Sequence, residues 1–124
     1  MAKILAVDDS PSIRRLVSMT LQQAGHDVES AEDGAEALNK AKAGNYDVVI
    51  TDVHMPVMDG ITFTRELRKL NHCRFIPVLV LTTESASEMK MQGKNAGATG
   101  WIVKPFNPDS LNRVLDRVLD PGRS

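Results

Sequence analysis

Four short apolar runs divide the chain, and each leads directly into polar residues. The runs cover residues 4–7, 48–51, 78–81 and 101–103, and they lead into Asp8 and Asp9, Asp52, Thr82 and Thr83, and Lys104. Uninterrupted runs rich in β-branched residues are typical of strands buried on both faces of a parallel sheet. The carboxyl ends of parallel strands lie at one edge, where open α/β sheets bind ligands. The pattern therefore predicts that these polar side chains meet in one small space.

Helical patterns lie between these runs, together with a further short strand around residues 27–30. The first helix is expected to begin at Ser10-Pro11, a cap followed by a first-turn proline, and to stop at Gly25. Its apolar face has helical spacing and comprises Ile13, Leu16, Val17, Thr20, Leu21 and Ala24. The remaining helices are expected over residues 34–43, 59–70, 86–96 and 108–119, the last ending at Asp120-Pro121-Gly122. This alternation predicts a doubly wound α/β sandwich with a parallel sheet.

Composition adds limits to this picture. A chain of 124 residues is the size of one domain, with an expected core over residues 3–119 and no output domain. A net charge of −1 gives no reason to expect nucleic acid or an anionic membrane as a partner. The single cysteine, Cys73, excludes an internal disulfide and is expected to be chemically inert. With neither a signal peptide nor a membrane span in view, we expect a cytoplasmic monomer.

The carboxylates of Asp8, Asp9 and Asp52 form a candidate metal site. If the first and third strands are neighbours, these carboxylates lie close together. Their mutual repulsion then raises the pKa of at least one of the three. A hard divalent cation relieves this repulsion, and Mg²⁺ suits the site better than zinc because no His and Cys set has ligand spacing. The alternative is that Asp8 and Asp9 merely cap the first helix.

Lys104 and Thr82 would add a positive charge and a hydroxyl to the same edge. Lysine often provides a point charge to a phosphoryl group, and a hydroxyl can bond a phosphate oxygen. A simple ion pair between Lys104 and Asp52, and a threonine favoured by strand propensity, are the alternatives. Together the groups match phosphoryl transfer, which depends on positioning and on neutralising oxygens. Asp52 is the expected nucleophile, because carboxylates form aspartyl phosphates.

Four motifs resemble those of response-regulator receiver domains, and the resemblance covers essentially the whole chain. They are VDDS at 7–10, TDVHMPVMDG at 51–60, LTT at 81–83 and KPF at 104–106. The most similar subgroup is the single-domain chemotaxis regulators. The resemblance implies a flavodoxin-like (βα)5 sandwich with five parallel strands in the order 2-1-3-4-5. It also implies a two-component phosphoprotein rather than an enzyme, one that catalyses its own phosphorylation and dephosphorylation.

The resemblance also implies a role for each matching residue of the acidic edge. Asp52 would accept the phosphoryl group, and Lys104 would pair with that group. Mg²⁺ would be held by Asp9, Asp52 and the backbone carbonyl of His54, while Asp8 would contribute through water.

A conformational switch is implied as well. Thr82 would rotate toward the phosphoryl group and vacate space into which Trp101, at the position of the family's switching aromatic, would swing. This movement would remodel the face made by the fourth helix, fifth strand and fifth helix. Thr83 lies where a very small residue is common and borders access to the phosphorus. His54 and Glu84 lie where the family varies its residues and tunes phosphoryl lifetime, and a cis bond is implied before Pro105.

The expected partners are a sensor histidine kinase of the CheA type, a flagellar motor switch protein and a phosphatase. Within the same class, a phosphate sink or a phosphorelay intermediate without a motor target is the alternative. A phosphatase of the haloacid dehalogenase type would need an acid two residues after its nucleophile, where this chain has His54. A flavin carrier would need amides and hydroxyls around the phosphate, where this chain has Asp8 and Asp9.

Overall fold

The structure is a computed structural model that describes residues 2–83 and 87–119. The expected lifetime-tuning position Glu84, the expected helix start at Ala86 and the expected helix end at Asp120-Pro121-Gly122 therefore lie outside the described residues. Among the residues described, no helix combines the length and the apolar character that crossing a membrane requires.

Within residues 2–83 and 87–119, five strands and five α-helices alternate. The strands are β1 (Lys3–Val7), β2 (Asp27–Ala31), β3 (Val48–Thr51), β4 (Val78–Thr82) and β5 (Gly100–Val103). The helices are α1 (Pro11–Gln23), α2 (Gly34–Ala43), α3 (Gly60–Leu67), α4 (Ser87–Ala96) and α5 (Pro108–Leu119), with a 3-10 turn at Asn71–Cys73. All strand pairs are parallel, and the sheet order is β2-β1-β3-β4-β5. The predicted fold class and strand order are confirmed.

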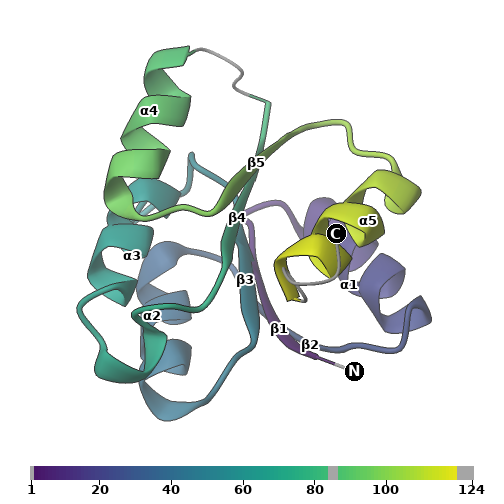
Figure 1. The fold of residues 1–124 in the computed structure, drawn as a ribbon, viewed down its shortest axis with the longest axis horizontal. Helices are drawn as coiled ribbons and strands as arrows, with labels where there is room; N and C mark the ends of the chain where they lie inside the picture. Colours follow the sequence, from purple (N-terminus) through teal and green to yellow (C-terminus); the bar gives the residue numbers. More distant parts are fainter. Residues whose placement is uncertain (1, 84–86, 120–124) are drawn as a thin grey trace.

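The sheet is the middle of three layers, and its two faces carry separate cores. Helices α1 and α5 cover one face, and α2, α3 and α4 cover the other (Figure 1). Alternation along β4 sends Leu79 and Leu81 toward the α1 and α5 side and Val78 and Val80 toward the opposite side. Because both faces of β1, β3 and β4 are buried, polar residues are excluded until each strand ends.

Side-chain caps begin the first two helices, and the cap of α1 is the predicted one. Ser10 is the N-cap of α1 and accepts a hydrogen bond from the Ile13 N–H at 3.4 Å, with Pro11 following. In the same way Asp33 caps α2 and accepts from the Glu36 N–H at 2.8 Å. The expected apolar face of α1 is only partly buried, because Leu16 is 47% exposed and Ala24 is also exposed.

Helix α3 is shorter than its sequence pattern suggested, ending at Leu67 rather than Leu70. The next turn tightens, since Lys69 and Leu70 donate to carbonyls three residues back at 3.1 and 3.0 Å. The guanidinium of Arg68 extends from this turn to the carbonyls of Cys73 (2.9 Å), Ile76 (2.6 Å) and Gly97 (2.6 Å). Arg68 thus connects the end of α3 to the loop before β4 and to the end of α4.

Candidate functional site

Backbone hydrogen bonds extend the parallel ladder one residue past the strand ends and fix three of the predicted site residues. The N–H of Asp8 donates to the carbonyl of Ala31 at 3.1 Å, and the N–H of Asp52 donates to that of Val7 at 2.9 Å. Between β4 and β5, at the far end of the strand order, the N–H of Lys104 donates to the carbonyl of Thr82 at 2.7 Å. The side chains therefore start from regular strand geometry at a common edge, as predicted.

The ammonium of Lys104 lies between two carboxylates. Its Nζ is 2.7 Å from Oδ2 of Asp8 and 3.4 Å from Oδ2 of Asp52. The three side chains are largely buried, with exposures of 12%, 6% and 12% for Lys104, Asp8 and Asp52. The simple pair between Lys104 and Asp52 considered from the sequence is therefore incomplete, because the shorter contact is to Asp8.

Asp8 is held in place from several directions. Its Oδ1 accepts from the Ser10 N–H at 2.9 Å, and its backbone carbonyl accepts from the Arg14 guanidinium at 2.6 Å. The residue that caps α1 is Ser10, so capping is not the main role of Asp8. Arg14 is a residue of the site that no sequence pattern predicted. Its position, one turn after the helix start beside the acidic pair, was the available signal.

Asp52 is a buried carboxylate, 9% exposed as a residue, whose Oδ1 accepts from the Val53 N–H at 2.7 Å. Burial raises the pKa of Asp52, the Lys104 ammonium opposes this rise, and the nearby charge of Asp8 adds to it. The predicted upward pKa shift is confirmed for Asp52, but burial contributes more to it than carboxylate repulsion does. Any additional positive charge at this edge of the sheet would stabilise the ionised form of Asp52.

Gly60 allows the loop after β3 to pack against the backbone of Asp52. Its N–H donates to the carbonyl of Val53 at 2.8 Å, and a Cβ at this position would lie 1.8 Å from the carbonyl oxygen of Asp52. That separation is impossible for two non-bonded atoms, so any side chain here would displace Asp52. Asp59 precedes this glycine and caps α3. Gly60 is part of the TDVHMPVMDG motif, but no pattern in the sequence indicates why a glycine is needed there.

One oxygen atom from each of Asp8, Asp9 and Asp52 lies within 4.8 Å of the other two. The donors are all carboxylates, with Asp8 buried, Asp52 at 9% exposure and Asp9 exposed to solvent. This set suits a hard divalent cation that keeps part of its water shell, as Mg²⁺ does. Among the described residues the cluster contains no His or Cys side chain, which disfavours zinc. His54, two residues after Asp52 in the chain, has an exposed side chain. Thr83, the residue after β4, is exposed as well.

Thr82 and Trp101 lie on the same face of the sheet, on neighbouring strands. Val80 is paired with Trp101 and Thr82 with Val103, so Thr82 is two residues beyond the partner of Trp101 and shares its face. This is the face covered by α3 and α4, where Trp101 packs against a small cluster that includes Val80 and Ala96. Thr82 is buried and Trp101 is partly exposed. The spacing suits a mechanical link between the acidic edge and the tryptophan.

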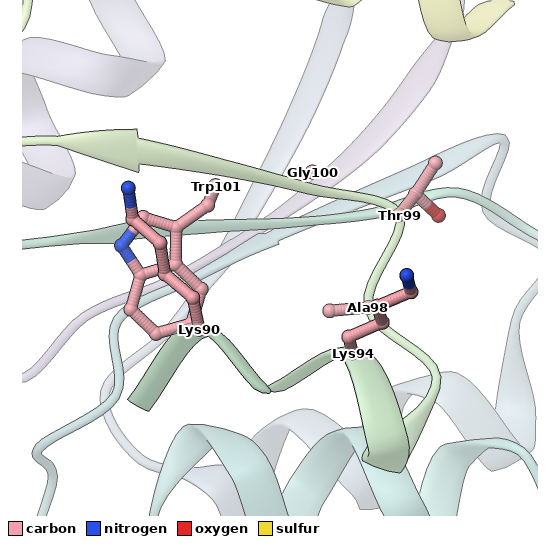
Figure 2. Close-up of a pocket in the computed structure, with 6 residues that line it drawn as sticks. All are labelled: Lys90, Lys94, Ala98, Thr99, Gly100 and Trp101. Carbon is pink, nitrogen blue, oxygen red and sulfur yellow. The ribbon is translucent and has the colours of Figure 1, made fainter. Parts of the chain in front are cut away.

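Beside Trp101 a surface pocket opens between α4 and β5. It has a volume of about 230 Å³ and is lined by Lys90, Lys94, Ala98, Thr99, Gly100 and Trp101. Figure 2 shows the indole and the Lys90 side chain at one end of this pocket and Thr99 at the other. The pocket thus combines an aromatic side chain with two lysine side chains among its lining residues.

Comparison with known proteins identifies the class to which this fold and this acidic edge belong. The family model of the response regulator receiver domain matches residues 4–116, so the chain belongs to that family. It is 38% identical over 119 residues to the chemotaxis protein CheY-3 of Vibrio cholerae serotype O1, which covers 95% of this chain and 92% of that protein. The predicted membership of the receiver family, in its CheY-like branch, is confirmed.

Solved structures agree with the sequence relatives. The chemotaxis protein CheY4 of Vibrio cholerae superimposes with a TM-score of 0.92 at 57% identity, covering 95% of this chain and 98% of that one. The receiver domain of the sensor histidine kinase PA1611 from Pseudomonas aeruginosa PAO1 gives 0.89 at 30% identity, covering 95% and 97%. That second structure has a magnesium ion coordinated in its active site cleft. The chain is therefore a CheY-like receiver domain of two-component signalling with chemotaxis proteins among its relatives.

Proposed function

We propose that the protein is a phosphorylation-controlled switch in which Asp52 accepts a phosphoryl group from a histidine kinase. The observation that carries this proposal is the position of the Lys104 ammonium between the carboxylates of Asp8 and Asp52. A buried carboxylate whose pKa is raised, with a fixed cation beside it, is a nucleophile placed where negative charge can be neutralised. Support also comes from membership of the receiver family.

The chain's own residues account for the steps of the transfer. An oxygen of Asp52 forms a bond to phosphorus as the bond from phosphorus to the donor nitrogen breaks, and the leaving imidazole takes a proton. Lys104 then pairs with the transferred group, a role supported by its contacts with Asp8 and Asp52. Asp9, Asp52 and the backbone carbonyl of His54 would hold Mg²⁺, with Asp8 acting through water, and the ion would neutralise charge on the phosphoryl oxygens. Attack by water returns the carboxylate and releases phosphate, so the protein ends its own signal.

The signal would leave through the surface around Trp101. Thr82 bonds the phosphoryl group and moves, and Trp101 follows because it shares that face of the sheet. The face of α4, β5 and α5, with the pocket of Figure 2, then changes shape for a partner. A chemotaxis relative at 38% identity favours a cytoplasmic partner at the flagellar motor switch. A phosphate sink or relay is the second candidate function.

Labelling with a small donor tests the acceptor assignment. We expect acetyl phosphate with Mg²⁺ to add one phosphoryl group, detected by intact mass. Asp52→Asn should abolish the addition, whereas Asp116→Asn, an exposed carboxylate on α5, should retain it. Full labelling of the Asp52→Asn variant would overturn the assignment.

Affinity capture from the source lysate separates the two output hypotheses. The protein would be used with Mg²⁺ alone and with Mg²⁺ plus beryllium fluoride, which stands in for the phosphoryl group. Enrichment of a flagellar switch protein only with beryllium fluoride would support motor control. Recovery of a kinase or phosphotransfer protein alone, mostly without beryllium fluoride, would favour the sink or relay.

A further inference from the structure

The C-terminal end of α4 has the Schellman arrangement but lacks the apolar side chain that often accompanies it. Gly97 has a φ of +108°, and its N–H donates to the carbonyl of Lys94 at 3.0 Å. The N–H of Ala98 donates to the carbonyl of Gly93 at 2.9 Å. These two bonds form the Schellman pattern, which is often accompanied by an apolar contact between the residues at the positions of Gly93 and Ala98. Gly93 has no side chain to make that contact.

The indole of Trp101 lies where a side chain of residue 93 would otherwise be. A Cβ built on Gly93 would lie 2.8 Å from Cζ3 and 3.3 Å from Cε3 of the indole, and 3.8 Å from the Cβ of Ala98. Carbon atoms in contact prefer separations of about 3.5–4.0 Å, so an alanine at 93 and the ring in its present place are incompatible. A residue of β5 therefore completes the end of α4, the helix that directly precedes this strand.

Hydrogen bonds from Arg68 fix the C-terminal end of α4, where Gly93 contacts the indole. The guanidinium of Arg68 donates twice to the carbonyl of Gly97, at 3.2 and 2.6 Å, and fixes the turn immediately after Gly93. Glycine inside a helix is unfavourable because it loses more backbone freedom than alanine does. A buried glycine within α4 is explained by the ring that rests on it.

We propose that Gly93 is the positioning residue for Trp101, and that it forms a seat holding the indole against α4 in the resting protein. Movement of Thr82 would act on the output face by lifting the ring from this seat. The second statement rests on the proposed function, whereas the seat is a property of the unphosphorylated chain and can be tested alone.

The fluorescence of Trp101, the only tryptophan, tests the seat directly. In unphosphorylated Gly93→Ala, the displaced indole should become more exposed, so emission should move to longer wavelength and quenching by acrylamide should increase. Asn95→Ala is the matched control, because it introduces alanine at an exposed position of the same helix. Its emission should equal that of the unsubstituted protein. Unchanged emission and quenching in Gly93→Ala would overturn the proposal.

Thermal unfolding provides a second test that does not depend on fluorescence. Gly93→Ala should lower the unfolding midpoint of the unsubstituted protein, because the ring loses its place. In a Trp101→Ala background the same change should raise the midpoint, because only the gain in helix propensity remains. A rise in both backgrounds would show that the ring does not rest on Gly93.

Beryllium fluoride with Mg²⁺ tests the coupling separately. The emission change that it causes in the unsubstituted protein should shrink in Gly93→Ala, where the ring has already left the seat. No change in the unsubstituted protein would show that the proposed coupling of Thr82 to Trp101 is wrong, while the resting emission would still decide the seat. Asp52→Asn, which should not respond, shows whether the acceptor assignment itself has failed.

Discussion

Asp52 is subject to two opposing influences that set its chemistry. Burial raises its pKa, and the ammonium of Lys104, 3.4 Å away, counteracts this effect only in part. The closer partner of that ammonium is Asp8. Asp52 is therefore an incompletely neutralised anion inside the fold, a state that favours binding of a cation and reaction with an electrophile.

The incomplete neutralisation predicts that Asp52→Asn stabilises the protein without Mg²⁺. Because the folded-state pKa is raised, the stability associated with Asp52 is fully present below its unfolded value near 3.8 and is lost as pH rises through the folded value. At pH 7 the ionised side chain thus lowers the free energy of unfolding, and removing its charge should raise the midpoint in a thermal melt.

Two comparisons sharpen this measurement. Asp116→Asn removes an exposed carboxylate and should leave the midpoint nearly unchanged. The difference between Asp52→Asn and the unsubstituted protein should vanish in melts below about pH 3.8. A lower midpoint for Asp52→Asn at pH 7 would mean that its ion pair with Lys104 outweighs the effect of burial.

Removing the Lys104 ammonium should lower the stability of the protein, in contrast to Asp52→Asn. Lys104→Met leaves Asp8 and Asp52 without their shared partner, and we expect a loss of roughly 1–3 kcal/mol in denaturant unfolding without Mg²⁺. Mg²⁺ binding should persist, but beryllium fluoride should no longer change the Trp101 emission. Lys69→Met breaks an exposed pair with Glu66 and should cost less than about 1 kcal/mol. Equal losses in the two variants would contradict the central position of Lys104.

At the scale of elements, the sequence was most informative where local chemistry decides the structure. Ser10 and Pro11 mark the start of α1, and the residues 34–43 predicted for α2 are those observed. Periodicity overestimated α3, because the turn at Arg68 depends on carbonyls that lie far along the chain. The spacing of Leu16 is helical, but spacing alone does not say how wide a stripe the sheet covers.

Arg68 shows how a single side chain joins elements, and its removal should loosen one end of α4. Hydrogen bonds from a charged donor contribute about 1.5–3 kcal/mol, so we expect Arg68→Met to destabilise by at least this amount. Amide exchange near Gly97 should accelerate more than exchange in β1, as measured by mass spectrometry. Arg65→Met, on the exposed side of α3, provides the control. Uniform acceleration across the sheet would indicate general destabilisation rather than a local connection.

For the molecule as a whole, we expect the acidic edge to link stability to Mg²⁺. A ligand that binds only the folded state adds about 2.7 kcal/mol at a concentration one hundred times its dissociation constant. We therefore expect Mg²⁺ to raise the midpoint in calorimetry, and a chelator to reverse the rise. Asp9→Asn should lose most of this response with little change in its midpoint without metal, because Asp9 is exposed. An undiminished response would place the ion elsewhere.

The candidate site was largely predictable for the same reason that the sheet was. Parallel strands that are apolar throughout place polar residues at their ends, so Asp8, Asp52 and Lys104 were expected at one edge of the sheet. The supporting contacts were not predictable, because Arg14 binds a backbone carbonyl and Gly60 is required by a close approach of two backbones. Backbone partners leave no complementary residue in the sequence.

The contact between Lys104 and Asp8 spans 96 residues, nearly the full length of the fold. Such non-local contacts form late, since the intervening chain must first be ordered. A chain emerging from the ribosome has Asp8, Asp9 and Asp52 long before β5 brings Lys104 to the edge. If Asp52 accepts a phosphoryl group as proposed, the charge arrangement that this transfer uses is complete only once β5 has joined the sheet.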